Sequence, residues 1–253
     1  MANLVEKNWD YTHQAAYYCY RPNYSPKLLD VLKFYIGESV KNVADIGAGT
    51  GNLTVMLLER GYKVNAVEPN DAMREEGIKR TVGQDVVWRK ANGTVTGLED
   101  KSVDWVTFGS SFNVMDRDIA LAESHRILKD GGCFSCMWNH RDLNDKTQEI
   151  AENIIIKYVP EYSRGVRRED QRPVIEKNSH LFSDIFYIEH DFWFEQTKEN
   201  YINAWRSVRN QYWDMDTEGG RKLFGEISTE MMNSLPDVFK IKYTSRCWTA
   251  QKR

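Results

Sequence analysis

The sequence predicts an α/β fold with a mostly parallel sheet and helices on both of its faces. Three observations support this prediction. Short apolar segments alternate with helical segments over the first 140 residues, a glycine-rich turn follows the first apolar segment, and an acidic residue ends the second. Ligands of such sheets bind beyond the carboxyl ends of the strands, so functional residues are expected there.

The elements follow from local signals in chain order. A helix is expected over 26–36 because Ser25 is a favourable N-cap, Pro26 suits the first helical position and Gly37 can end it. Apolar periodicity predicts strands over 42–46, 62–67, 85–88, 103–108 and 133–138, and helices over 50–60, 71–79 and 119–128. The last helix is expected to end at Gly131-Gly132 and to turn these residues inward: Ile119, Ala122, Ile127 and Leu128.

The alternation lapses between about residues 140 and 185. A helix over 150–158 and a charged loop over 164–172 are expected there, followed by a strand over 185–194, a helix over 198–211 and a strand over 239–250. The irregular stretch is too long for a simple loop, which predicts a substrate-covering insertion. The chain therefore reads as one domain, divided into a lid (1–37), a core (38–140), the insertion (141–185) and the end of the sheet (186–253).

Composition limits the classes of function. With 253 residues and 41% hydrophobic content the chain can bury a sizeable core, and its longest apolar runs are too short to span a bilayer. The first residues lack the pattern of a signal peptide, so a cytoplasmic location is expected. A net charge of -3 gives no general attraction to nucleic acid or to an anionic membrane. The expected partner is a small molecule, and the expected state is a monomer or homodimer.

The cysteines do not predict a metal or redox site. Cys133 and Cys136 have C-x-x-C spacing, but they fall in an expected strand, whose alternation sends them to opposite faces. No second C-x-x-C completes a tetrahedral site. Buried, reduced cysteines are therefore expected, and no metal.

The glycine-rich turn predicts a nucleoside site. Gly47, Gly49 and Gly51 let the backbone turn tightly and approach a ligand, and Glu68 ends the second strand, where an acid can hold a ribose diol. The dinucleotide pattern G-x-G-x-x-G needs a glycine at position 52, which this chain lacks. Asp45 would repel a pyrophosphate but favours a sulfonium and its ammonium group. A methyl donor fits this pattern better than a dinucleotide.

The segment from Asp45 to Gly51 resembles the first motif of class I S-adenosylmethionine-dependent methyltransferases, D-x-G-x-G-x-G. The resemblance implies a Rossmann-like class I methyltransferase fold with a seven-stranded, mostly parallel sheet, a last strand that enters antiparallel, and S-adenosyl-L-methionine as cofactor. It also implies that the aromatic segment 9–24 folds over the donor, with Arg21 pairing with the donor carboxylate, and that the chain at Asn92-Gly93 contacts the adenine. The expected cofactor-binding residues are Tyr20, Arg21, Asp45, Gly47, Ala48, Gly49, Glu68, Pro69, Asn92, Gly93 and Ser110.

The acceptor side is indicated by fewer signals. The residue pattern W-N-x-R-D over 138–142 resembles that of relatives of trans-aconitate methyltransferase. His140 in this pattern is the expected general base, and His13 is the other candidate for that role. Tyr11 and Tyr17 are further catalytic candidates. Asn113 and Val114 stand where relatives often have a histidine-tryptophan pair, so the usual substrate contacts are not expected to carry over.

A basic cluster predicts an anionic acceptor. Arginine forks bind carboxylate or phosphate, and four arginines fall in the insertion, with Arg141 close by in sequence: Arg164, Arg167, Arg168 and Arg172. The alternative is a solvated face neutralised by Glu169 and Asp170. The segments 108–114 and 136–143 are similar to methyltransferases of bacterial surface-polysaccharide and secondary-metabolite pathways, including ones suspected of making O-methyl phosphoramidate groups.

The sequence thus predicts methyl transfer to a small, anionic or nucleotide-linked metabolite, with oxygen as the favoured acceptor atom. The alternatives are an N-methyltransferase of a secondary metabolite, a nicotinamide-dinucleotide oxidoreductase and a non-catalytic donor-binding protein.

Overall fold

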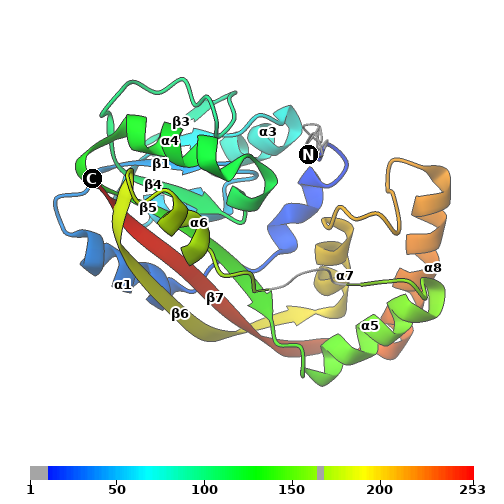
Figure 1. Ribbon diagram of the computed structural model, residues 1–253. Coiled ribbons are helices and arrows are strands. Elements are labelled where there is room, and N and C mark those ends of the chain that lie inside the picture. Colours follow the sequence, from blue (N-terminus) through cyan, green and yellow to red (C-terminus); the bar gives the residue numbers. More distant parts are fainter. Residues whose placement is uncertain (1–10, 164–167) are drawn as a thin grey trace.

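The computed structural model describes residues 11–163 and 168–253 (Figure 1). A seven-stranded sheet has the order β3-β2-β1-β4-β5-β7-β6. Its strands are β1 (Asn42–Ile46), β2 (Lys63–Val67), β3 (Val86–Arg89), β4 (Val103–Gly109), β5 (Leu128–Arg141), β6 (Phe182–Thr197) and β7 (Val238–Lys252). The first five strands are parallel, and β7 runs antiparallel to both β5 and β6. The predicted α/β fold and its antiparallel last strand are confirmed.

Helices cover both faces of this sheet. They are η1 (Ala15–Tyr20), α1 (Pro26–Ile36), α2 (Asn52–Leu58), α3 (Asp71–Arg80), η2 (Phe112–Val114), α4 (Arg117–Ile127), α5 (Lys146–Tyr158), α6 (Arg172–Lys177), α7 (Lys198–Arg206) and α8 (Glu218–Ser234). Buried side chains of α1 and α2 pack on one face, and those of α4 and α6 pack on the other. Cys133 and Cys136 belong to these two separate cores, and both are free thiols, as predicted.

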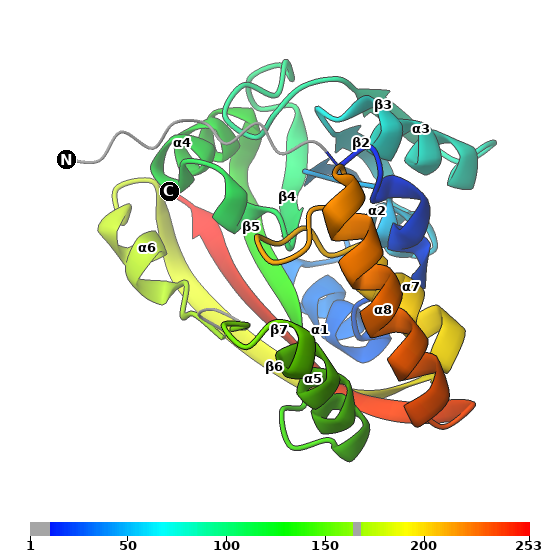
Figure 2. The same ribbon diagram turned by 90° about the vertical axis from the view of Figure 1, so that its right-hand side faces the viewer.

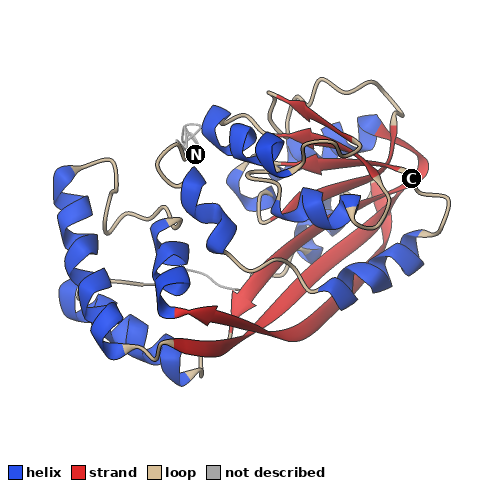
Figure 3. Cartoon of the chain, turned by 180° about the vertical axis from the view of Figure 1, so that it is seen from behind, coloured by secondary structure: helices blue, strands red, loops and turns tan. Residues whose placement is uncertain are grey.

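A third core lies beyond the end of β5. The strands β6 and β7 pair over their whole lengths, whereas β5 pairs with β7 only from Tyr243 onward. The extra length forms a two-stranded extension, on which α5, α7 and α8 pack around buried Tyr201, Trp205, Trp213 and Phe224. Figure 3 shows these helices grouped to one side of the main sheet, and Figure 2, viewed from that side, shows α5 and α8 in front of it. The helices therefore form a layer of their own beside the carboxyl end of β5.

The structure corrects three expectations. Helix α4 begins at Arg117, after the N-cap Asp116, and its buried residues are Ala120, Leu121, Ser124 and Ile127. Ile119 and Ala122 are exposed, because the capped start places them on the opposite side of the helix; Leu128 is buried, but as the first residue of β5. The glycine pair lies inside β5, where Gly132 approaches the Asp104 carbonyl so closely that a Cβ would lie 2.8 Å from its oxygen.

The helical layer was predicted only in part. The expected helix over 198–211 ends at Arg206, and α8 was not predicted at all, although Thr217 caps it and five of its residues are buried. The layer covering the end of β5 therefore combines part of the predicted insertion with α7 and α8.

Candidate functional site

The glycine-rich turn connects the end of β1 to the start of α2. All three glycines have positive φ angles, +66° at Gly47, +58° at Gly49 and +83° at Gly51. At Gly47 a side chain has no room, since a Cβ would lie 2.5 Å from the Cβ of Ser111. The N–H groups of Gly47 and Ala48 donate to the Val67 carbonyl at 2.8 and 3.0 Å, which ties the turn to the end of β2. The backbone is thus left open toward a ligand above the strand ends.

Glu68 follows β2 directly and is bonded to the turn. Its Oε2 accepts from the Gly49 N–H and its Oε1 from the Asn70 N–H, each at 2.9 Å. The side chain is only 7% exposed; burial raises its pKa, while the two backbone hydrogen bonds oppose that shift. Each carboxylate oxygen keeps lone-pair capacity for a diol. The adjacent Pro69 is exposed at the same strand end.

Asp45 lies beneath the turn rather than in its open side. It is buried, with Oδ2 accepting from the Thr54 hydroxyl at 2.6 Å and Oδ1 from the Thr107 hydroxyl at 3.2 Å. Burial raises its pKa to about 6, although both threonine hydrogen bonds act against this. The residue joins β1 to α2 and β4, so it fixes the position of the turn in addition to supplying negative charge.

The end of β4 completes this edge. Ser110 has a φ of +60°, a conformation rare for residues with a side chain, and its hydroxyl lies 2.9 Å from that of Tyr24. The Ser111 hydroxyl donates to the Ile46 carbonyl at 2.5 Å. A strained residue at a strand end is typical of functional sites. Ser110 was predicted as a site residue from the sequence. Tyr24, whose hydroxyl contacts that of Ser110, was not.

Asn92 and Gly93 follow β3. The Asn92 side-chain oxygen accepts from the N–H groups of Thr94 and Val95 at 3.0 and 2.9 Å, so it closes its own turn. A Cβ at Gly93 would lie 2.4 Å from the Met115 sulfur and 2.9 Å from Ile46 Cγ2. Gly93 therefore packs against the ends of β1 and the chain after β4, which brings this turn to the predicted edge.

The N-terminal segment crosses to the helical layer. Arg21 donates from Nε to the Ser207 hydroxyl and from Nη2 to the Ser207 carbonyl, both at 2.7 Å, and its guanidinium lies 4.0 Å from the centre of the Tyr18 ring. Its Nη1 has no acceptor within residues 11–163 and 168–253. Both N–H groups of Nη1 and the second N–H group of Nη2 are thus left for the predicted pairing of Arg21 with a ligand carboxylate.

The tyrosines of this segment differ in their surroundings. Burial raises the pKa of Tyr11, with Tyr18 adding to the shift and Arg21 and Arg209 opposing it. Tyr11 is therefore a hydrogen-bonding phenol at neutral pH. The Tyr17 ring lies 5.6 Å from the Arg206 guanidinium, and Tyr20 is half-buried at the end of η1. Helix η1 of this segment contacts both α3 and α7. That the segment covers the donor stays a prediction.

The end of β5 carries three polar residues in a row. Asn139 donates to the carbonyls of Pro22 and Asn23 at 3.2 and 3.0 Å, which fixes the N-terminal segment on the sheet. His140 pairs across the strands with Thr244, and Arg141 pairs with Tyr243. Because side chains alternate along a strand, His140 and Arg141 lie on opposite faces. The competitor His13 is exposed, with Nε2 3.6 Å from Asp216.

The predicted basic cluster is paired where it is described. Arg168 lies 3.7 Å from Glu189 and Arg172 lies 3.9 Å from Glu176, and all four side chains are exposed to a substantial degree. Arg164 and Arg167 lie outside the described residues. Arg168 and Arg172 thus lie on a solvated, neutralised face, as in the alternative, but the neutralising carboxylates are those of Glu189 and Glu176. Glu169, which the alternative named, pairs with Arg117 at 2.8 Å.

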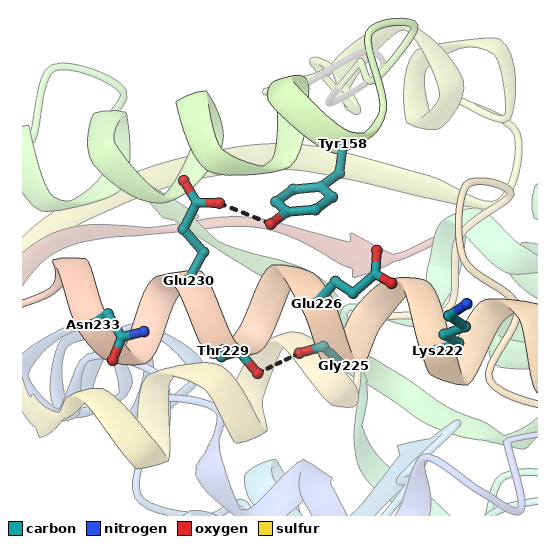
Figure 4. Close-up of a pocket in the computed structure, with 7 residues that line it drawn as sticks. All are labelled: Tyr158, Lys222, Gly225, Glu226, Thr229, Glu230 and Asn233. Atoms are coloured by element: carbon teal, nitrogen blue, oxygen red, sulfur yellow. Dashed lines mark hydrogen bonds between the residues drawn. The ribbon is translucent and has the colours of Figure 1, made fainter.

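A surface groove of about 590 Å³ lies between α5 and α8 (Figure 4). Glu230 crosses it to accept from the Tyr158 hydroxyl at 2.8 Å. No residue predicted for the site lines this groove. Within the described part of the chain, no helix is long and apolar enough to cross a membrane, and no group of three metal-ligating side chains is present.

The order of the sheet, the glycine turn and the buried acid after β2 together define a class I S-adenosylmethionine-dependent methyltransferase fold. Residues 44–136 match the family model described as "Methyltransferase domain". This segment is a methyltransferase domain, with S-adenosylmethionine as its methyl donor.

Individual relatives agree with this assignment. An uncharacterized methyltransferase of Mycobacterium tuberculosis is 35% identical over 122 residues, which cover 48% of each chain. The ubiquinone/menaquinone biosynthesis C-methyltransferase UbiE of Desulfotalea psychrophila is 34% identical over 126 residues, again 48% of each. The matches thus span about half the length of these relatives. A solved structure of a candidate type II methyltransferase from Anaeromyxobacter dehalogenans shares the fold, with a TM-score of 0.62, 14% identity, and coverage of 91% of this chain and 97% of that one.

Proposed function

We propose that this chain methylates an oxygen atom of a small acceptor that carries an anionic group. The observation that supports methyl transfer most strongly is the joint placement of the Gly47–Gly51 turn and Glu68. The acid is bonded to the turn through the Gly49 N–H at 2.9 Å, and both belong to the matched segment 44–136. This arrangement offers an acidic, partly satisfied carboxylate beside an open backbone, which suits a ribose diol next to a cationic centre.

The donor-binding roles follow from the described geometry. Glu68 would hold the ribose diol with its remaining lone pairs, and Arg21 would hold the donor carboxylate with its Nη1. The turn at Gly47, Ala48 and Gly49 would lie against the donor, with Pro69, Asn92-Gly93 and Ser110 at its edges and Tyr20 above. Asp45 would act from beneath through its charge. When bound, S-adenosylmethionine supplies a methyl group that its sulfonium has already activated.

The acceptor side needs alignment and a route for a proton. We assign the base to His140 because imidazole is the usual general base among side chains and because His140 lies at the end of β5, where ligands of such sheets bind. Tyr11 and Tyr17 would orient the acceptor as hydrogen-bonding groups, since burial raises the pKa of Tyr11 and removes it as a base.

Oxygen as the acceptor atom rests on the resemblance of segments 108–114 and 136–143 to surface-polysaccharide methyltransferases. Proteins with other chemistry are similar to this chain as well. They include the C-methyltransferase UbiE and, in fold, the phosphoethanolamine N-methyltransferase 2 of Haemonchus contortus, with a TM-score of 0.56 and 16% identity over 98% of this chain and 59% of that one. Analysis of the product therefore has to decide the atom.

The test is a transfer assay with methyl-labelled donor over a panel of cellular metabolites. We expect label in a phosphate- or carboxylate-bearing acceptor, linked through oxygen. His140→Ala should lower turnover while donor affinity stays unchanged, and its effect should shrink at high pH, where acceptors ionise without help. Donor binding with no transfer to any acceptor would favour a non-catalytic donor-binding protein, and labelled carbon or nitrogen would refute the proposed atom.

A further inference from the structure

Two arginines of the long antiparallel strands have nearly the same surroundings. Arg141 donates from Nε to the Tyr243 hydroxyl at 3.0 Å, and its guanidinium lies 4.6 Å from the centre of the Trp205 ring. Arg246 donates from Nε to the Tyr187 hydroxyl at 2.8 Å, and its guanidinium lies 4.6 Å from the centre of the Trp248 ring. In both cases a tyrosine hydroxyl and a tryptophan face hold the fork in place.

The two arginines differ in charge compensation. The Arg246 Nε lies 3.6 Å from a carboxylate oxygen of Glu189. Arg141 forms no ion pair with any carboxylate of residues 11–163 and 168–253, and in that range its two terminal nitrogens donate to no acceptor. A guanidinium that is partly withdrawn from water without a counter-charge is costly, and aromatic faces compensate only part of that cost.

The surroundings of Arg141 offer further donors. Besides Trp205, the Tyr201 ring lies 5.3 Å from its guanidinium, and Tyr162 stacks on Trp213 close by in the same core. The indole nitrogen of Trp213, in the same core, is buried without a hydrogen-bond partner among the described residues. An unpaired donor close to an uncompensated cation favours an anion as the missing component.

We propose that Arg141, beside the aromatic cluster of Tyr162, Tyr201, Trp205, Trp213 and Tyr243, binds the anionic group of the methyl acceptor, a carboxylate or a phosphate. Its two terminal nitrogens present the planar fork that such oxygens accept in pairs. The position at the end of β5 suits a ligand beyond the strand ends. The assignment of this anion to the acceptor rests on the proposed function, whereas the anion site itself does not.

The proposed anion site differs from the cluster expected from the sequence. Arg168 and Arg172 are paired with glutamates on the surface, while Arg141 faces the helical layer and has no such partner. The acceptor would thus be held from the face of the sheet opposite to His140. Its anionic end and its reacting oxygen would then be separate parts of the molecule.

The test is a titration of the whole chain, loaded with S-adenosylhomocysteine, with inorganic phosphate and separately with malonate. The indole N–H signals of Trp205 and Trp213 in nitrogen-15 NMR spectra report on the surroundings of Arg141, after assignment with Trp→Phe variants. We expect one of the two anions to shift these signals saturably, and Arg141→Met to weaken that binding about tenfold or more. Phosphate and malonate together tell which anion class the site prefers.

The matched control is Arg246→Met, which removes a similarly stacked arginine that lies beside the Glu189 carboxylate, shared with Arg168, and it should leave anion binding unchanged. Arg141→Lys keeps the charge but loses the fork, so it should bind the anion with intermediate affinity. Absence of a saturable shift in the unmodified protein with both anions would overturn the proposal without depending on any variant. Equal binding by the unmodified protein and a folded Arg141→Met would overturn it too. Donor binding is measured in the same samples, so failure of donor binding would count against the proposed function alone.

Discussion

The two sides of the site are built in different ways. On the donor side, the site is formed mainly by backbone groups: three glycines with positive φ, two N–H groups hydrogen-bonded to the Val67 carbonyl and one hydrogen-bonded to the Glu68 carboxylate. On the acceptor side, side chains from β5, β7, α7 and the loop after α7 surround Arg141 with aromatic rings. A site built from backbone has a short, readable motif, whereas a site built from side chains of distant segments has none. This contrast explains why the donor is identified more firmly than the acceptor.

The largest expected effect concerns the backbone of the donor side. Gly47→Ala should lower the free energy of unfolding by about 2–4 kcal/mol, because the new Cβ meets both an unfavourable φ and Ser111. Gly61→Ala is the control: its φ of +83° is equally unfavourable, but no atom lies within 4 Å of the added Cβ. Urea unfolding of both variants measures the difference. Equal losses would show that crowding at the turn is unimportant.

The second effect is a dependence of stability on pH. Burial raises the pKa of Asp45 from 3.8 to about 6, so the folded state holds its proton more tightly than the unfolded chain. The stabilisation is complete below about pH 4 and is lost as the pH rises through 6, with a total of up to about 3 kcal/mol. The measurement compares unfolding free energies of the unmodified protein and Asp45→Asn between these values. A constant difference between the two proteins would contradict the raised pKa.

The third effect concerns donor affinity. Glu68→Ala should weaken binding of S-adenosylhomocysteine by about 1–3 kcal/mol through loss of charge-assisted hydrogen bonds. Glu68→Gln, which keeps one acceptor oxygen, should lose less. Calorimetry on both variants gives the ranking, and unchanged affinity in the alanine variant would remove the ribose assignment.

The smallest effect concerns the contact that holds the strained Ser110. Tyr24→Phe removes a hydroxyl 2.9 Å from the Ser110 hydroxyl and should cost about 0.5–1.5 kcal/mol of stability. Tyr62→Phe is a matched control, since Tyr62 is also buried but its hydroxyl has no partner among the described residues. Removal of the Tyr62 hydroxyl should change the free energy of unfolding only slightly. Thermal or urea unfolding distinguishes the two, and equal costs would mean that the Tyr24 bond adds nothing.

The contrast between local motifs and contacts of distant segments also decides which parts of the fold could be predicted from the sequence. The strand over 42–46 was predicted correctly because its apolar run is a local signal. The helix over 26–36 was predicted correctly because the residues Ser-Pro at its start are a local signal too. Helix α4 was shifted because its cap, Asp116, was not recognised, and α8 was missed because Gly219, Gly220 and Gly225 weaken its helical pattern. The aromatic cluster around Arg141 could not be predicted, since Tyr162, Trp205 and Tyr243 come from distant segments that meet on the extension of β6 and β7.

The basic cluster shows the limit of counting charges along a sequence. Four arginines between 164 and 172 suggested an anion site, yet Arg168 and Arg172 lie beside glutamates. Arg141 was set beside that cluster only through its position in the sequence. The absence of a counter-charge depends on which residues the fold brings near, and a sequence does not display that property.

The most direct test of the account is calorimetric titration of the unmodified chain with S-adenosylhomocysteine and, separately, with NADH. Asp45, the glycine turn and Glu68 predict saturable binding of one S-adenosylhomocysteine per chain and no binding of NADH. The pyrophosphate of NADH would meet two buried acids, and this chain lacks the glycine at position 52 that the dinucleotide pattern needs. Binding of NADH alone would contradict the donor assignment, and the proposed methyl transfer with it.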